Sequence, residues 1–144
     1  MILTNCYRVT TIKRLSELKS LFLAAALIWT LAVTILCLST FRSLPSIEVE
    51  GFDKVGHLIF HIGIVSLWYL YFFSASGLQL RSSLFKAVAF SLAFGIVIEL
   101  LQGSITDTRT ADIQDVFANA TGSAIAALII VLLTIYRNKV SANN

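Results

Sequence analysis

Two acidic side chains inside long apolar runs are the first sign of chemistry in this sequence. Glu99 stands near the end of one run and Asp115 at the start of the next. An ionised carboxylate in hydrocarbon costs several kcal/mol unless it is paired or hydrated, so acids at such positions are functional candidates. His57, in a third apolar run, suits proton exchange near neutral pH. We therefore interpret Glu99, His57 and Asp115 as candidate catalytic acids and bases.

Cationic and amide side chains accompany these acids and are candidates for binding a ligand. Arg109 lies in the polar stretch between the two acidic runs, where its planar guanidinium can hold a phosphate or carboxylate through two hydrogen bonds. Lys54 precedes His57 by three residues and offers a second positive charge. The candidate binding residues all stand at the polar ends of apolar runs, and they are Arg109, Lys54, Asp53, Gln102, Asp112 and Asn119.

Two histidines are weak candidates for a metal site. His57 and His61 are four residues apart and share a helix face, so an acid from a neighbouring helix would complete a set of three ligands. No second pair of nearby ligands fixes the rest of such a site, and oxygen-rich neighbours would leave the metal's identity open. We therefore predict no metal and no cofactor, and we interpret His61 as a structural residue.

Each candidate residue also has a purely structural interpretation. Asp115 and Asn119 can cap a helix and form hydrogen bonds to its neighbour. Hydrogen bonding to a nearby acid can be the whole role of His57. Arg109 can balance the aspartates around it, and Lys54 can extend to the membrane interface. The sequence alone leaves both interpretations open.

The apolar runs give the chain the composition of a membrane protein. Of its 144 residues, 57% are hydrophobic and 13% are charged, against about 25% charged in an ordinary soluble domain. Four runs have about the 20 residues that a helix needs to cross a bilayer, and they cover residues 21–38, 55–73, 84–101 and 116–136. We predict an all-α, four-helix transmembrane bundle, with a basic N-terminal segment (1–20), a short tail (137–144) and an unassigned loop (39–53).

Charge in the connecting segments predicts the orientation of the bundle. Basic residues gather on the cytoplasmic side of membrane proteins. Here they gather before the first run, around Arg81 between the second and third runs, and in the tail at Arg137 and Lys139. The other two loops are rich in aspartate and glutamate. We therefore expect both termini in the cytoplasm and the two acidic loops outside.

Small residues indicate which helix faces meet. One face of the third run carries, at every fourth position, Ala87, Ser91, Gly95 and Glu99. Small side chains let helix backbones approach closely in lipid, and the fourth run repeats such a stripe at Gly122, Ser123, Ala126 and Ala127. Because a short loop joins these two runs, we expect antiparallel packing with Gly95 and Gly122 in close contact. The start of the second run should join the polar residues that meet at the outer end, which are Glu99, Gln102, Asp115 and Asn119.

Three motifs together resemble the signature of the VanZ-like family. They are Asp53-Lys54-Val55-Gly56-His57, Glu99-Leu100-Leu101-Gln102, and a run from Arg109 through Asp112 and Asp115 to Ala118-Asn119 and Gly122. The similarity extends from residue 53 to the end of the fourth run, and it includes neither His61 nor the usual proline before Arg109. It implies a small bacterial protein that crosses the cytoplasmic (inner) membrane several times. The family's namesake is associated with low-level resistance to the glycopeptide antibiotic teicoplanin.

Three classes of function fit these residues. The first is an enzyme or binding module that acts from the outer face on an anionic cell-envelope molecule, such as a phospholipid headgroup or a lipid-linked wall precursor, and whether turnover occurs is left open. The second is a non-catalytic interaction or structural protein of the envelope. The third is an ion or proton pathway, which we do not favour because no ionisable residue continues the route inward from Glu99. The expected partner is the lipid bilayer and not nucleic acid, since the basic residues follow the topology.

Overall fold

The computed structural model contains four long helices in the part of the chain that it describes. These are α1 (Ile2–Leu38), α2 (Phe52–Ala75), α3 (Leu80–Ile105) and α4 (Ile113–Ala142). The backbone is described for residues 2–39, 52–75, 79–105 and 112–143, and the side chains for 17–39, 53–75, 79–104 and 112–143. All four helices contain a segment long and apolar enough to cross a membrane. The predicted all-α fold and the multi-pass membrane character are thereby confirmed.

Every helix extends beyond its apolar run. The backbone of α1 is helical from Ile2, so the basic N-terminal segment continues the first membrane helix. At the other end of the chain, α4 continues to Ala142 through most of the tail. A helix that continues past the apolar run keeps its backbone N–H and C=O groups paired. Polar residues near the bilayer boundary consequently lie on ordered helical turns.

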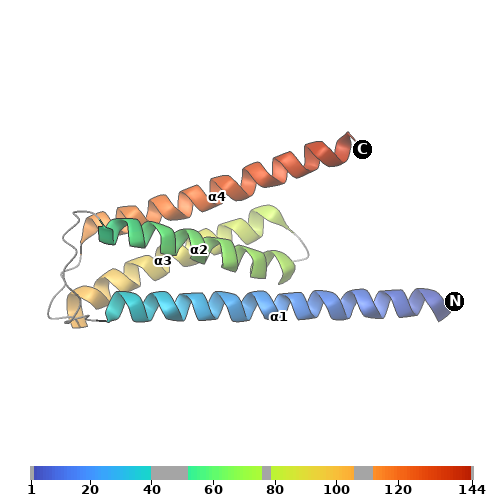
Figure 1. Cartoon of the computed structure of the whole chain (residues 1–144), viewed down its shortest axis with the longest axis horizontal. Helices are drawn as coiled ribbons and strands as arrows, with labels where there is room; N and C mark the ends of the chain where they lie inside the picture. Colours follow the sequence, from blue (N-terminus) through green and yellow to red (C-terminus); the bar gives the residue numbers. More distant parts are fainter. Residues whose placement is uncertain (1, 40–51, 76–78, 106–111, 144) are drawn as a thin grey trace.

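Helix α2 lies at the centre of the bundle and contacts each of the other three helices. Figure 1 shows α1 and α4 along opposite sides, with α2 and α3 between them. The chain begins and ends at the same end of the bundle. The last turns of α1 and α3 and the first turns of α2 and α4 lie at the opposite end, which we call the polar end. The direction in which this end faces across the membrane remains a prediction.

Glycines set the closest helix contacts. A Cβ atom at Gly122 of α4 would collide with the backbone carbonyl of Leu58 in α2. The close contact expected between the third and fourth helices at Gly122 is therefore made with the second helix instead. At Gly95 of α3, a Cβ atom would lie 2.9 Å from Asn119 Nδ2 and 2.9 Å from His61 Cε1. Gly95 thus faces both α4 and α2, and side chains fill the space between them.

Two clusters of buried apolar residues hold the helices in register. The first cluster joins α1, α2 and α3, and its buried members are Val33, Cys37, Ile64 and Ile98. The second joins α2, α3 and α4, and its buried members are Val65, Tyr69, Ala87 and Ala126. Because α2 and α3 contribute to both clusters, the polar residues on these two helices have little freedom to slide past each other.

Candidate functional site

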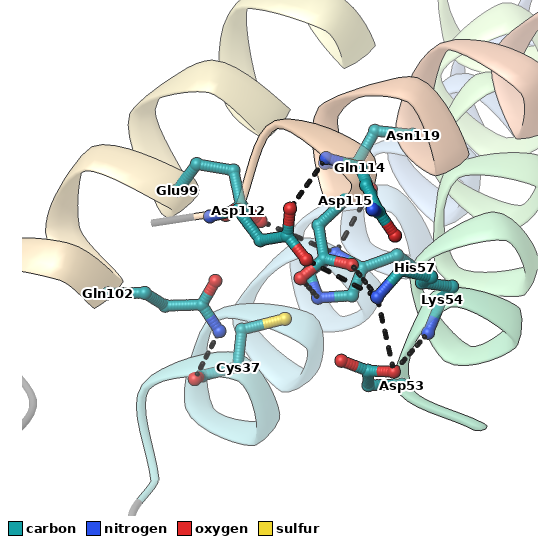
Figure 2. A network of polar contacts seen from close by, with 10 residues as sticks. All are labelled: Cys37, Asp53, Lys54, His57, Glu99, Gln102, Asp112, Gln114, Asp115 and Asn119. Carbon is teal, nitrogen blue, oxygen red and sulfur yellow. Dashed lines mark hydrogen bonds and ion pairs between the residues drawn. The ribbon is translucent and has the colours of Figure 1, made fainter. Parts of the chain in front are cut away.

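Lys54 connects the start of α2 with the start of α4. Its Nζ atom lies 3.3 Å from Asp112 Oδ2 and 3.9 Å from Asp115 Oδ1. It also lies 3.9 Å from Asp53 Oδ1, on its own helix. Figure 2 shows these three aspartates around the lysine side chain. The predicted meeting of the second and fourth runs therefore depends on one ammonium group that is shared among three carboxylates.

Asp112 caps α4 and joins it to α3. Its side chain accepts a hydrogen bond of 2.8 Å from the backbone N–H of Gln114, while its own backbone N–H donates one of 3.3 Å to Glu99 Oε2. The bond from Gln114, together with the ammonium of Lys54, lowers the pKa of the Asp112 carboxyl below its usual value. Asp112 consequently carries a negative charge at neutral pH, where the N-terminus of a helix stabilises it.

The three candidate catalytic residues meet inside the bundle, one from each of α2, α3 and α4. Solvent reaches only 4% of His57, 4% of Glu99 and 8% of Asp115. The imidazole stands between the two acids, with Nδ1 3.8 Å from Glu99 Oε1 and Nε2 3.8 Å from Asp115 Oδ2. Both distances exceed that of a hydrogen bond. We call this group of three residues the carboxylate–histidine centre (Figure 2).

Asn119 holds the imidazole of His57 in place. Its Oδ1 atom lies 3.1 Å from His57 Nδ1, one turn further along α4 than Asp115. If Nδ1 carries the proton and donates it to this oxygen, Nε2 keeps its lone pair and faces Asp115. In that tautomer a basic nitrogen lies beside the Asp115 carboxylate.

Several buried polar atoms of the centre lack a hydrogen bond. Among the described side chains, Glu99 Oε1, Asp115 Oδ1 and Asn119 Nδ2 are buried without a hydrogen-bond partner. Most buried polar atoms in proteins do have such a partner, and its absence costs about 1–3 kcal/mol for each group. The centre therefore has capacity to bind a further proton, ion or polar ligand.

A second polar group lies deeper in the bundle and is fully hydrogen-bonded along its length. His61 Nδ1 is 2.8 Å from Ser91 Oγ, which is 2.9 Å from Ser123 Oγ. Ser123 in turn donates to the backbone carbonyl of Asn119 at 2.8 Å. Since Ser123 has only one proton to donate, Ser91 must donate to Ser123 and accept from His61. We call these three residues the histidine–serine chain.

The spacing of these residues in the sequence is a signal for this chain. His61 follows His57 by one turn, Ser123 follows Asn119 by one turn, and Ser91 precedes Glu99 by two turns. Each spacing keeps the residue on the same helix face but moves it away from the polar end. Ser91 and Ser123 were interpreted only as small packing residues.

Gln102 lies elsewhere than predicted. Its amide donates a hydrogen bond of 2.8 Å to the backbone carbonyl of Cys37 at the end of α1. The three residues from Glu99 to Gln102 turn the helix by about 300°, so the two side chains point in directions about 60° apart. Gln102 therefore joins α3 to α1, whereas Glu99 faces α2 and α4.

A pocket beside the carboxylate–histidine centre lies between α3 and α4. Its volume is about 260 Å³, and it is lined by Ile96, Glu99, Leu100, Asp112, Ile113 and Val116. Leu100 and Ile113 are also largely exposed on the outer surface of the bundle. The pocket thus combines two acids with side chains that would face lipid in a membrane.

Arg109 lies outside the described residues, and so does the rest of the loop 106–111. Its predicted role in binding an anion stays a prediction. Asp53, which shares Lys54, is exposed at the rim of the polar end. The roles assigned to the other candidate residues likewise stay predictions, although the structure brings most of them together.

The chain matches a known protein family. A sequence model of a protein family described as VanZ/LLP1 matches residues 10–134, which include the membrane segments of the first three helices and most of that of α4. This finding confirms the resemblance seen in the three motifs and extends it to α1. No curated protein and no solved structure matches the chain.

Proposed function

Since the chain belongs to the VanZ/LLP1 family, we propose that it is a bacterial cytoplasmic-membrane protein whose polar end binds or acts on an anionic cell-envelope molecule. The class of ligand is a phospholipid headgroup or a lipid-linked wall precursor. The observation that carries this proposal is the pocket between α3 and α4, because it reaches Glu99 and is open on the lipid-facing side. The headgroup would occupy the part of the pocket next to Glu99 and Asp112, and its chains would lie along Leu100 and Ile113.

An anionic headgroup needs positive charge nearby, and the described residues include few basic side chains at the polar end. Lys54 is the one lysine or arginine near the centre among them, and its ammonium lies 3.3 Å from Asp112. Arg109 precedes Asp112 by three residues, next to the N-terminus of α4. Backbone N–H groups at a helix N-terminus favour anions as well. We propose that Arg109 binds the phosphate through two hydrogen bonds and that Lys54 assists it.

The carboxylate–histidine centre would supply proton transfer beside the bound headgroup. His57 Nε2 would accept a proton from a hydroxyl group of the ligand or from water while Asn119 holds the ring. A positioned general base of this kind contributes about 10²–10⁴-fold to a rate. Glu99, at the wall of the pocket, would exchange protons with the ligand. The alternative is a protein that binds the same molecule without turnover.

The proposed activity requires the polar end to face outward. In a variant in which alanine replaces Cys6 and Cys37, we expect a membrane-impermeant maleimide to label a cysteine at position 108 and to spare one at position 82. Labelling at position 82 alone would place the polar end in the cytoplasm and would overturn the orientation.

Lipid binding tests the proposed ligand class. The protein would be reconstituted in nanodiscs of phosphatidylcholine, and native mass spectrometry would count the phosphatidylglycerol or polyprenyl phosphate molecules that it retains. We expect wild type to retain the phosphate lipids, and both Arg109→Ala and Arg109→Lys to lose them, because lysine keeps the charge but not the planar fork. Arg81→Ala, at the other end of α3, is the matched control. Equal retention by Arg109→Ala and wild type would contradict the proposal.

The link to glycopeptides has a separate test. We expect expression of the chain in a susceptible bacterium to raise the minimal inhibitory concentration of teicoplanin. Glu99→Gln keeps the size of the side chain and most of its hydrogen bonds but removes the exchangeable proton. Loss of tolerance in Glu99→Gln at an equal amount of membrane protein supports chemistry, and retained tolerance supports the non-catalytic alternative.

A further inference from the structure

We propose that His57, Glu99 and Asp115 together bind one divalent metal cation. One ligand atom from each of these residues lies within 4.8 Å of the others, and the three come from three different helices. This set differs from the pair of histidines considered in the sequence, because His61 Nδ1 is bonded to Ser91. A cation on His57 Nε2 would occupy the lone pair to which the proposed function assigns proton transfer, so this inference gives that nitrogen a different role while it leaves the proposed class of ligand unchanged.

Unpartnered oxygen atoms are the second observation that points to a ligand here. Glu99 Oε1 and Asp115 Oδ1 are buried without a hydrogen-bond partner in the described part of the chain. Both residues are more than nine-tenths buried, and their carboxylates point toward His57 (Figure 2). Buried carboxylate oxygens that lie close together and accept no hydrogen bond are suited to a bound cation.

The charge at the polar end also favours a cation. Within the described residues, the ammonium of Lys54 lies within 3.9 Å of three carboxylates, those of Asp53, Asp112 and Asp115. It is closest to Asp112 and is one-third exposed, whereas Glu99 and Asp115 are buried. Buried charge that is only partly compensated is destabilising. A divalent cation between Glu99 and Asp115 would neutralise both.

The imidazole of His57 has the orientation of a metal ligand. Metal-binding histidines commonly use one ring nitrogen for the metal and donate the other N–H to an oxygen, which fixes the tautomer. The 3.1 Å contact between His57 Nδ1 and Asn119 Oδ1 provides that second bond and leaves Nε2 facing Asp115. Asn119 is thus a positioning residue for the proposed site.

The three ligand atoms are somewhat further apart than those of an occupied metal site. Ligand atoms around a tetrahedral zinc ion lie roughly 3.4 Å apart, since the bonds measure about 2.0–2.2 Å. Here the three lie within 4.8 Å of one another, and His57 Nε2 is 3.8 Å from Asp115 Oδ2. The 3.8 Å contact of Glu99 is with Nδ1 instead, so the Glu99 carboxylate would have to turn toward Nε2 to complete the site. One nitrogen and two carboxylate oxygens suit zinc or manganese. The pocket beside Glu99 would leave the remaining coordination position open.

Direct metal binding tests the inference without any assay of activity. Purified protein in detergent would be stripped with a chelator, exchanged into chelator-free buffer and titrated with Zn²⁺ or Mn²⁺ in a calorimeter. We expect one ion per chain and a higher thermal midpoint in the presence of the ion, because ligands that bind only the folded state stabilise it. Elemental analysis after dialysis would give the stoichiometry independently.

Variants assign the binding to these three residues. We expect Glu99→Gln, which keeps the shape of the side chain, to weaken binding by roughly 100-fold or more, given that even second-shell substitutions cost 10- to 100-fold. Asp115→Asn should do the same, and if it does not fold, Glu99→Gln alone decides. Glu17→Gln, an exposed acid at the start of the membrane segment of α1, is the matched control and should bind as wild type does. Binding that is absent in wild type, or equal in wild type and Glu99→Gln, would overturn the inference. Lipid retention measured in chelator reports on the proposed function separately.

Discussion

Two histidines one turn apart on α2 have opposite surroundings. His61 donates into a chain of hydroxyl groups that ends at a backbone carbonyl, and every link is between 2.8 and 2.9 Å. His57 stands between two carboxylates at 3.8 Å, and each of these acids carries a buried oxygen without a hydrogen bond. Both side chains are almost completely buried, so burial alone does not distinguish them.

The difference between their partners separates a structural group from a functional one. Neutral hydroxyl groups with complete hydrogen bonding stabilise the contacts among α2, α3 and α4 and leave no capacity for a ligand. Buried carboxylates with free oxygens weaken the protein, and proteins retain such groups where a ligand or a reaction needs them. We therefore propose the carboxylate–histidine centre as the functional part and the histidine–serine chain as a structural support.

The largest expected effect is on teicoplanin tolerance, when each of the two histidines is replaced by glutamine in a separate variant. His57→Gln removes the proposed general base, which contributes about 10²–10⁴-fold to a rate, so the teicoplanin tolerance should disappear. His61→Gln should keep the tolerance at an equal amount of folded protein, because an amide can still bond to Ser91. The two variants would be compared by minimal inhibitory concentration and by quantitative immunoblots of membranes. Equal loss in both would erase the distinction drawn between the two histidines.

The next effect concerns the helix contact that holds both groups together. Gly122→Ala places a methyl group against the Leu58 backbone, and overpacking of this kind lowers the free energy of unfolding by roughly 1–3 kcal/mol. Gly56→Ala is the matched control, because its Cβ would have an ordinary contact of 3.8 Å with Phe60. Titration with a denaturing detergent measures both. If the two variants are equally stable, α2 and α4 are not in close contact at Gly122.

A smaller effect is expected within the histidine–serine chain. Ser91→Ala interrupts it and leaves His61 without its acceptor, and hydrogen bonds between membrane helices contribute about 0.6 to 2 kcal/mol. Ser123→Ala should cost a similar amount, and the double variant should cost less than the sum of the two. Additive losses in this double-mutant cycle would show that the two serines do not interact.

The smallest effect concerns the cap of α4. Asp112→Ala removes the acceptor for Gln114 N–H and the partner of Lys54, so the thermal midpoint should fall by a few degrees at neutral pH. The pKa of Asp112 is lowered in the folded protein, and its stabilising contribution is therefore present at neutral pH and lost as the pH falls through that lowered pKa. The difference between wild type and variant should shrink in acid. A constant difference would show that the charge of Asp112 has no part in the cap.

The sequence predicted the helices and the residues of the centre better than it predicted which helix each face contacts. Acids near the ends of apolar runs and loops of few residues were enough to bring Glu99, Asp115 and Asn119 together. The periodicity of a helix gives the face of a residue but not the helix that this face meets. For this reason Gly122 contacts α2, although the short loop suggested α3. Gln102 was likewise expected beside α4 and instead binds α1.

The residues of the proposed metal site could not be predicted from the sequence, for a related reason. The sequence placed His57 and His61 on one face, which suggested a pair of ligands on a single helix. In the structure, His61 is hydrogen-bonded to Ser91. Two acids from other helices, Glu99 and Asp115, lie beside His57 instead. Distances between side chains on different helices depend on how deeply the helices interlock, which small residues permit but do not specify.

The effect of Glu99→Gln on stability in the presence of a chelator tests the central claim most directly. The claim is that the carboxylate–histidine centre lowers the stability of the folded protein, whereas the histidine–serine chain raises it. Removing one of two buried carboxylates around His57 relieves their repulsion and their desolvation. At pH 7.5, without metal, we therefore predict a higher thermal midpoint for Glu99→Gln than for wild type, and a lower one for Ser91→Ala. A midpoint for Glu99→Gln that equals or falls below that of wild type would contradict the account.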